Sequence, residues 1–180
     1  STGYASTGIV GVNESYDGSS WTELGDVNTA RSFGSASGTQ GVSLYATGAT
    51  AGSNNNRVTN VETWDGSSWT EIADVNTAKY YSGTTGNAPA TSNINFGGQG
   101  DNTTGIVNTE NYDGTSWTEV ADLNLGRRTR GIGDSSTAAL CVGGSTPPSF
   151  TANTESWNGT AWTEVNNLNT ARGYLGCGGT

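Results

Sequence analysis

The stretch Val61 to Lys79, VETWDGSSWTEIADVNTAK, occurs in four variants along this chain, and the repetition decides the fold. The other copies are NESYDGSSWTELGDVNTAR (Asn13 to Arg31), TENYDGTSWTEVADLNLGR (Thr109 to Arg127) and TESWNGTAWTEVNNLNTAR (Thr154 to Arg172). Successive Trp-Thr-Glu sequences are 48, 48 and 45 residues apart. A period of this length is typical of stacked or radial units that bury their faces only against their neighbours.

Each copy of the motif predicts a β-hairpin. In the second copy, Val58 to Asp65 and Ser68 to Val75 alternate in part between apolar and polar residues, as strands do. Asp65-Gly66 separates them and predicts a tight turn, because Gly tolerates a positive φ. The corresponding dipeptides of the other copies are Asp17-Gly18, Asp113-Gly114 and Asn158-Gly159.

Two weaker strand signals lie between consecutive hairpins. The first follows the basic residue of the motif and is rich in small residues: Ser32 to Ser37, Tyr80 to Thr85, Thr129 to Gly133 and Gly173 to Cys177. The second precedes a glycine stop: Val42 to Thr47, Ser92 to Phe96 and Ala138 to Val142. Four short strands per unit and no helical period predict the blade of a β-propeller. The small residues suit an innermost strand, since few blades crowd the axis.

The order Gly-Gly, Glu-x-Tyr/Trp, Trp and a basic residue resembles kelch repeats, and the resemblance covers nearly the whole chain. Gly97-Gly98 and Gly143-Gly144 carry the double glycine, whereas the second unit has Thr47-Gly48. The gap from aromatic residue to Trp is shorter than in most kelch units. The segment Ser15 to Trp21 is also similar to the Asp-box turn of sialidase-like propellers. Such resemblances imply architecture and leave the activity open, because kelch-like propellers do many jobs.

We therefore predict one all-β domain over residues 1–180, a four-bladed kelch-like β-propeller with four antiparallel strands per blade. Blade 1 comprises 1–30 and 172–180, blade 2 comprises 31–78, blade 3 comprises 79–126 and blade 4 comprises 127–171. The C-terminal GYLGCGGT matches the inner-strand segment after Arg31 and would pair with the N-terminal STGYASTG to close the ring. The alternative is a segment of a longer array. The chain starts at Ser1 and has no Met, which indicates that an upstream part was removed or that the chain is a fragment.

The composition argues against several classes of function. A net charge of −9 without a basic run argues against nucleic-acid binding. No stretch approaches 18 apolar residues, so we predict no membrane insertion. The chain has no His for general-base work and no zinc-ligand spacing, so we predict no enzyme activity, no metal and no cofactor. Cys141 and Cys177 are interpreted as small buried residues, with a disulfide between them as the alternative.

The repeated side chains have structural interpretations beside functional ones. Eight aromatic residues are predicted to form the core between blades: Tyr16, Trp21, Trp64, Trp69, Tyr112, Trp117, Trp157 and Trp162. The repeated acids Glu23, Glu71, Glu119 and Glu164 are predicted to give a solvated outer edge. The basic residues Arg31, Lys79, Arg127 and Arg172 are expected to pair with acids such as Asp26, Asp74 and Asp122, or else to line a channel that attracts an anion. Arg128 and Arg130 break the symmetry and are the candidate anion contacts.

The loops after the second strands differ most between units, and variable loops on a rigid scaffold often bind ligands. They give the candidate ligand-binding residues Asn54, Asn55, Asn56, Asp101, Asn102 and Phe150. We expect a structural or protein-binding module of an exterior surface such as a virion, a phage tail or a cell envelope, with a protein partner or self-assembly. The alternative is a carbohydrate-binding propeller with a glycan partner.

Overall fold

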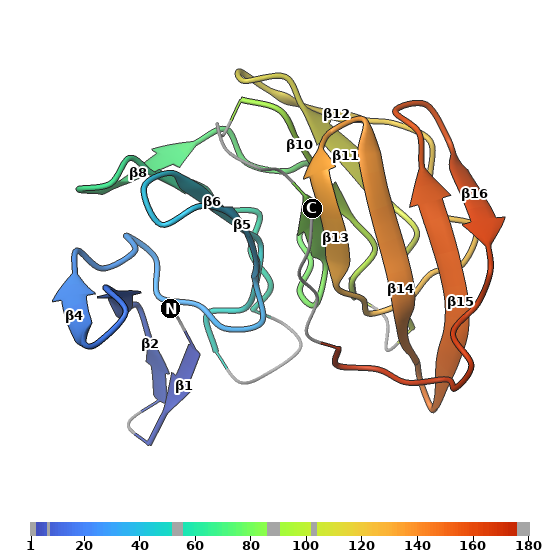
Figure 1. Ribbon diagram of the computed structural model, residues 1–180, viewed down its shortest axis with the longest axis horizontal. Coiled ribbons are helices and arrows are strands. Elements are labelled where there is room, and N and C mark those ends of the chain that lie inside the picture. Colours follow the sequence, from blue (N-terminus) through green and yellow to red (C-terminus); the bar gives the residue numbers. More distant parts are fainter. Residues whose placement is uncertain (1–2, 7, 52–55, 86–90, 102–103, 176–180) are drawn as a thin grey trace.

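The computed structural model describes residues 3–6, 8–51, 56–85, 91–101 and 104–175, and within these ranges all regular structure is β-strand. Figure 1 shows successive small sheets that follow one another along an arc. The described residues contain no helix that would be long and apolar enough to cross a membrane. The prediction of an all-β chain built of four-stranded antiparallel sheets is thus confirmed in outline.

Three sheets have the strand content predicted for a blade, each a four-stranded antiparallel meander, and we call these sheets blades. The first contains β5 (Ser35–Gly38), β6 (Ser43–Ala46), β7 (Val61–Trp64) and β8 (Trp69–Ile72) in that order. The second contains β9 (Gly83–Thr85), β10 (Asn93–Phe96), β11 (Thr109–Tyr112) and β12 (Trp117–Glu119). The third contains β13 (Gly131–Ser135), β14 (Ala138–Thr146), β15 (Ser149–Trp157) and β16 (Trp162–Val165). Most of these strands fall on the segments that the sequence predicts. The predicted loop that contains Phe150 is an exception, because β14 and β15 extend into it and Phe150 lies in β15, paired with Ser145.

The N-terminal unit differs from a complete blade. β1 (Gly3–Ala5) pairs with β2 (Gly8–Val10), and β3 (Asn13–Tyr16) pairs with β4 (Trp21–Leu24), as two separate two-stranded sheets. The prediction that residues 1–30 belong to one four-stranded blade does not hold for the described residues, because β1 pairs with β2 in a sheet separate from that of β3 and β4. Most of the C-terminal strand that would complete this unit, residues 176–180, lies outside the described residues.

The aspartates of the hairpin turns hold the backbone around each turn glycine. Asp65 Oδ1 accepts hydrogen bonds from the backbone N–H of Ser67 and of Ser68, both at 2.8 Å. Gly66 has φ +96°, a conformation that a side chain disfavours. Asp17, Asp113 and Asn158 make the same pair of bonds in their own turns. The repeated DG or NG dipeptide therefore sets the register of every hairpin.

The innermost strands are small because they approach one another closely. A Cβ on Gly83 would lie 2.9 Å from the backbone N of Gly131 in the next blade, and one on Gly131 would lie 2.3 Å from Phe96 Cζ. Buried hydroxyls fill the remaining space: Ser82 Oγ lies 3.1 Å from Ser35 Oγ, and Asn95 Nδ2 donates to both. Small polar side chains thus bond the inner strand of one sheet to the next sheet.

The repeated aromatic residues are buried unevenly. Trp64, Tyr112, Trp117, Trp157 and Trp162 are buried, and Trp69 is half-buried. Tyr16 is 47% exposed and Trp21 is 67% exposed. These two differ from the expected core position because no described blade lies on the outer side of the N-terminal hairpin.

Candidate functional site

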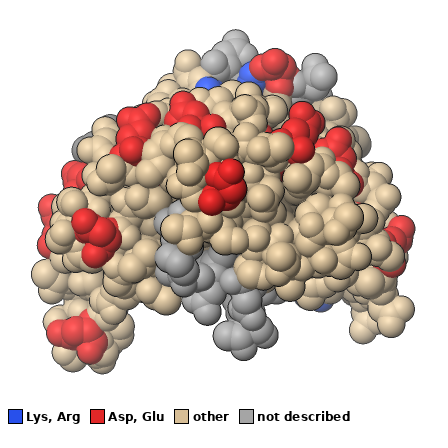
Figure 2. Space-filling model, turned by 90° about the horizontal axis from the view of Figure 1, so that it is seen from above, with Lys and Arg blue, Asp and Glu red and all other residues tan. Residues whose placement is uncertain are grey.

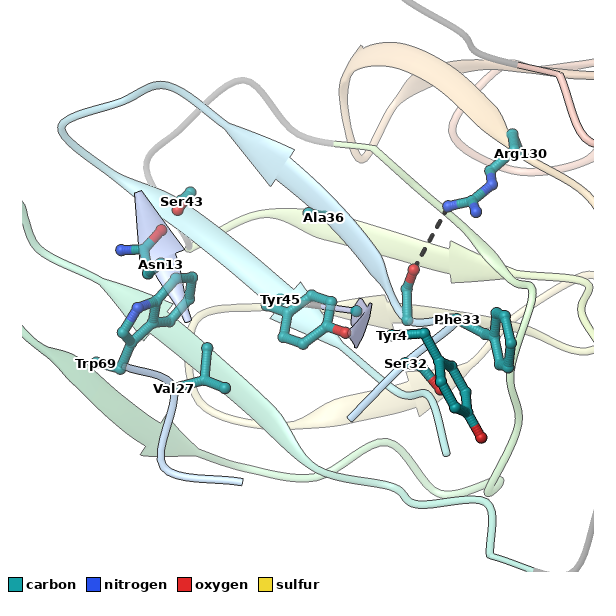
Figure 3. Close-up of a pocket in the computed structure, with 12 residues that line it drawn as sticks. Tyr4, Asn13, Val27, Ser32, Phe33, Ala36, Ser43, Tyr45, Trp69 and Arg130 are labelled. Carbon is teal, nitrogen blue, oxygen red and sulfur yellow. Dashed lines mark hydrogen bonds between the residues drawn. The ribbon is translucent and has the colours of Figure 1, made fainter. Parts of the chain in front are cut away.

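A cavity of about 530 Å³ lies at the junction between the N-terminal hairpins and the blade β5–β8. Figure 3 shows its side chains, with Tyr45 in the middle, Trp69 and Asn13 at one end, and Tyr4, Phe33 and Arg130 at the other. Four aromatic side chains and the polar groups of Asn13, Ser32, Ser43 and Arg130 contribute to its wall.

The cavity exists because this junction is packed less completely than the others. At the next junction Trp117 Nε1 donates to the backbone O of Ala73 at 2.9 Å, and at the third Trp162 Nε1 donates to Thr109 Oγ1 at 3.0 Å. Trp69 occupies the same repeat position, but its Nε1 is buried without a hydrogen-bond partner among the described residues. An unsatisfied buried donor is costly, so this junction is bonded less completely at the repeated Trp than the next two.

A row of aromatic rings runs beside this cavity and past the ends of the inner strands. Phe33 and Tyr81 have ring centroids 4.7 Å apart, and Tyr174 lies 6.1 Å from Tyr81. All three follow the basic residue of a motif by two positions and have φ between 56° and 59°. The backbone links the row as well, because Tyr81 N–H donates to the Phe33 carbonyl. This row was not among the predicted site residues, although the aromatic residue that recurs two positions after the basic residue was a usable signal.

The two symmetry-breaking arginines contact this row. The guanidinium of Arg128 lies 5.4 Å from the centroid of the Tyr81 ring, a cation–π arrangement. Arg130 is exposed, and its Nη1 donates to the carbonyl of Gly34 at 3.4 Å. Burial raises the pKa of Tyr81 above its usual value, with a further contribution from Tyr174. Both arginines therefore have partners in the protein, and Arg130 also borders the cavity.

The predicted loop residues lie around the same set of connections, as far as they are described. Asp101 is exposed and forms an ion pair with Arg57, which joins the loop after β6 to the loop after β10. Phe150 is 49% exposed and has its ring 6.0 Å from that of Tyr174. Asn56 is exposed. Asn54, Asn55 and Asn102 lie outside the described residues.

Three of the motif's four basic residues are buried in ion pairs, but with different acids from those expected, whereas Arg172 is exposed. Arg31, Lys79 and Arg127 pair with Glu62, Glu110 and Glu155, the glutamates in the third strand of the following blade. The expected partners take other roles, since Asp74 accepts from Thr59 and Asp122 from the backbone of Thr109. These basic side chains are fully buried, so they do not line an anion channel.

The asparagine of the motif completes each of these junctions, and a threonine adds a further bond at the first two. Glu62 Oε2 accepts from the backbone N–H of Asn28 at 2.6 Å and from Asn28 Nδ2 at 2.9 Å. Glu62 Oε1 accepts from the backbone N–H of Thr29 at 3.2 Å and from Arg31. We call this arrangement, in which Asn-x-x-Arg/Lys of one unit binds the glutamate of the next, the glutamate clamp. Asn76 and Lys79 form it around Glu110, and Asn124 and Arg127 form it around Glu155.

The remaining titratable groups form no evident catalytic set. Within the described ranges, no three His, Cys, Asp or Glu side chains gather in a way that would hold a metal ion. Cys141 is buried, and burial raises the pKa of its thiol, although Arg127 and Thr129 lie against the sulfur. A raised thiol pKa opposes thiolate chemistry. Cys177, the other half of the considered disulfide, lies outside the described residues.

Comparisons with known proteins bear on the fold. No family model matches this chain, and no curated protein sequence matches it. Among solved structures, that of YjhT superimposes with a TM-score of 0.70 at 15% sequence identity, over 88% of this chain and 52% of that chain. The chain thus spans about half the length of YjhT. At this identity the likeness shows a shared fold alone.

Proposed function

We propose that this chain is a non-enzymatic, kelch-like propeller module that makes protein contacts or assembles, on an exterior surface such as a virion, a phage tail or a cell envelope. The observation that carries the proposal is the exposure of large apolar side chains at both ends of the arc. Tyr16 and Trp21 are exposed at one end, and Leu140 and Val165 at the other. Clustered exposed apolar groups are typical of contact surfaces.

The charge distribution supports a protein partner rather than a polyanion. Figure 2 shows Asp and Glu spread over one face of the molecule, with little Lys or Arg visible there. The repeated Glu23, Glu71, Glu119 and Glu164 are exposed along the outer strands, where they oppose pairing between sheet edges. Contacts are therefore favoured at the ends of the arc over its acidic faces.

Sedimentation velocity over a range of concentrations tests this proposal. We expect the wild-type protein to associate, and Trp21→Ser to weaken association while circular dichroism and melting temperature stay unchanged, since Trp21 is exposed in the single chain. Tyr4→Ser, which alters an exposed aromatic residue away from the arc ends, is the control. A wild-type protein that stays monomeric with Trp21 accessible to oxidation would contradict the proposal.

The cavity supports carbohydrate binding as a second candidate. Sugars stack on aromatic rings and bond to amides and hydroxyls, and the wall combines Tyr4, Phe33, Tyr45 and Trp69 with Asn13 and Ser43. A glycan array followed by fluorescence titration of any hit tests this candidate. Binding should be lost in Trp69→Ala and kept in Trp21→Ala, because only Trp69 borders the cavity. An array without hits would dispose of it.

A further inference from the structure

Each inner junction of the arc joins two unlike surfaces. At the second junction Leu44, Ala46, Val61 and Val75 of one blade pack with Tyr112 and Trp117 of the next. At the third junction Ile94, Phe96 and Leu123 pack with Trp157 and Trp162. Each blade thus has an aliphatic face, directed toward the following unit, and an aromatic face, directed toward the preceding one. A glutamate clamp accompanies each contact.

The N-terminal end of the arc presents an aromatic face that no described blade covers. Tyr16 and Trp21 are exposed, and their ring centroids lie 5.1 Å apart, the same separation as in the buried pair Tyr112–Trp117. Glu14 lies opposite Glu23 in the register of this hairpin, just as the clamped Glu62 lies opposite Glu71. Glu14 is nevertheless exposed and forms no ion pair among the described residues.

The C-terminal end presents the complementary half. Leu140 pairs in register with Ser156 as Leu44 pairs with Thr63, and it is 39% exposed instead of buried. Val165, at the position of Ile72, is 40% exposed. Asn169-Thr170-Ala171-Arg172 repeats the clamp sequence that begins at Asn28, but the asparagine and arginine are exposed and no described glutamate lies between them.

We propose that these two ends bind each other between two copies of the chain, so that a fourth glutamate clamp forms head to tail. Arg172 and Asn169 of one copy would bind Glu14 of the second, and Leu140 and Val165 would cover Trp21. This proposal rests on the proposed contact function and identifies the partner as a second copy of the chain. It explains why the chain keeps a complete clamp sequence that no described residue fills.

The placement of the two ends favours a second copy over closure within one chain. The ends lie on opposite sides of the arc in Figure 1, with β4 at one side and β16 at the other. A head-to-tail interface that closes after two copies leaves no free end, and the propeller range of 4–8 blades accommodates two such arcs.

Two charge reversals at opposite ends test the proposal. Glu14→Arg damages only the N-terminal half of the interface, and Arg172→Glu damages only the C-terminal half. Each variant alone should self-associate at least about 30-fold more weakly than the wild type, because two side chains of like charge would then face each other in the clamp. An equimolar mixture should form a 1:1 complex, because the intact C-terminal end of the first variant meets the intact N-terminal end of the second. Glu23→Arg, exposed on the neighbouring strand, is the matched control.

The outcomes separate this proposal from the broader one. Association that survives either reversal, or a mixture that stays monomeric, would overturn the head-to-tail clamp and leave a contact module with another interface. A monomeric wild type in which Trp21 is protected from oxidation would overturn it in favour of closure within one chain. A monomeric wild type with Trp21 accessible would overturn both proposals.

Discussion

A single buried carboxylate joins each pair of described blades. Glu110 receives the backbone N–H of Asn76 at 2.6 Å, the side-chain amide of Asn76 at 3.0 Å and the ammonium of Lys79 at 3.2 Å. Burial lowers the pKa of Lys79, and Glu110 opposes that shift. A buried ion pair contributes little compared with an apolar pair, but the loss of one partner leaves an uncompensated charge. The clamp therefore fixes which strand meets which loop.

Glu110→Gln should lower the free energy of unfolding by about 3–5 kcal/mol at pH 7, since it leaves Lys79 charged and buried. Glu119→Gln changes the exposed glutamate opposite in the same hairpin and should have little effect. Urea denaturation of both variants measures the difference. Equal midpoints would show that the clamp is not a structural requirement.

The stability of variants that lack a clamp glutamate should also depend on pH in different ways, according to whether a Lys or an Arg is left without its partner. Without Glu110, burying the charged Lys79 destabilises the folded protein, and because the pKa of Lys79 is lowered in the folded state, this loss of stability is complete at pH values below that folded-state pKa. It disappears as pH rises toward the unfolded-state pKa near 10.5, because the ammonium is then neutral. In Glu155→Gln the remaining cation is Arg127, which keeps its charge over this range. The stability of Glu110→Gln should therefore recover between neutral and alkaline pH relative to that of Glu155→Gln. Parallel profiles would contradict the assignment.

At the scale of the elements, the turn carboxylates titrate in an unusual range. Hydrogen bonds from the backbone N–H of Ser68 and of Ser67 lower the pKa of Asp65 to about 2. A depressed carboxyl pKa stabilises the folded turn above the unfolded value near 3.8, and this contribution is lost as pH falls through about 2. Carbon-detected NMR titration of the carboxyl should show a midpoint well below 3.8. Asp65→Asn should keep the turn without the titration, as Asn158 does in its own turn.

The close approach of the inner strands leads to a second prediction at the scale of the elements, on the stability of a variant in an inner strand. Gly131→Ala should lower stability by about 1–3 kcal/mol, because the added methyl would lie 2.3 Å from Phe96 Cζ. Gly41→Ala is the matched control, since a Cβ there meets nothing within 4 Å. Thermal unfolding of both variants measures the effect. A Gly131→Ala protein as stable as the control would mean that the strands lie farther apart.

At the scale of the whole molecule, equivalent Trp residues should differ in energy by their place in the arc. Trp117→Ala should cost about 3–5 kcal/mol, the range for truncating a buried aromatic residue. The sequence predicts the same loss for Trp69→Ala, but the half-buried Trp69 beside the cavity should lose less. Trp21→Ala should cost least in dilute protein, because its face is exposed. Melting temperatures of the three variants test this order, and equal losses would show that the N-terminal junction is closed in solution.

The sequence by itself determined the structural repeat, with its hairpin and its inner strand. The repeated DG or NG dipeptides locate the hairpins, because each turn needs a glycine with positive φ and a side-chain acceptor before it. The runs of small residues locate the inner strands, since a methyl group at Gly83 or Gly131 has no room. These are local requirements, and a local pattern is sufficient to reveal them.

Only the tertiary structure decided which partner each copy of a repeated residue has and how deeply that copy is buried. Arg31 stands five positions after Asp26 in the sequence, yet its partner is Glu62, because the stacking of blades buries that carboxylate and leaves the aspartate in solvent. Trp21 and Trp117 occupy the same place in the motif, yet one is 67% exposed and the other 6%. Burial is a property of the neighbouring blade, and the motif of a single unit carries no information on whether that neighbour is present.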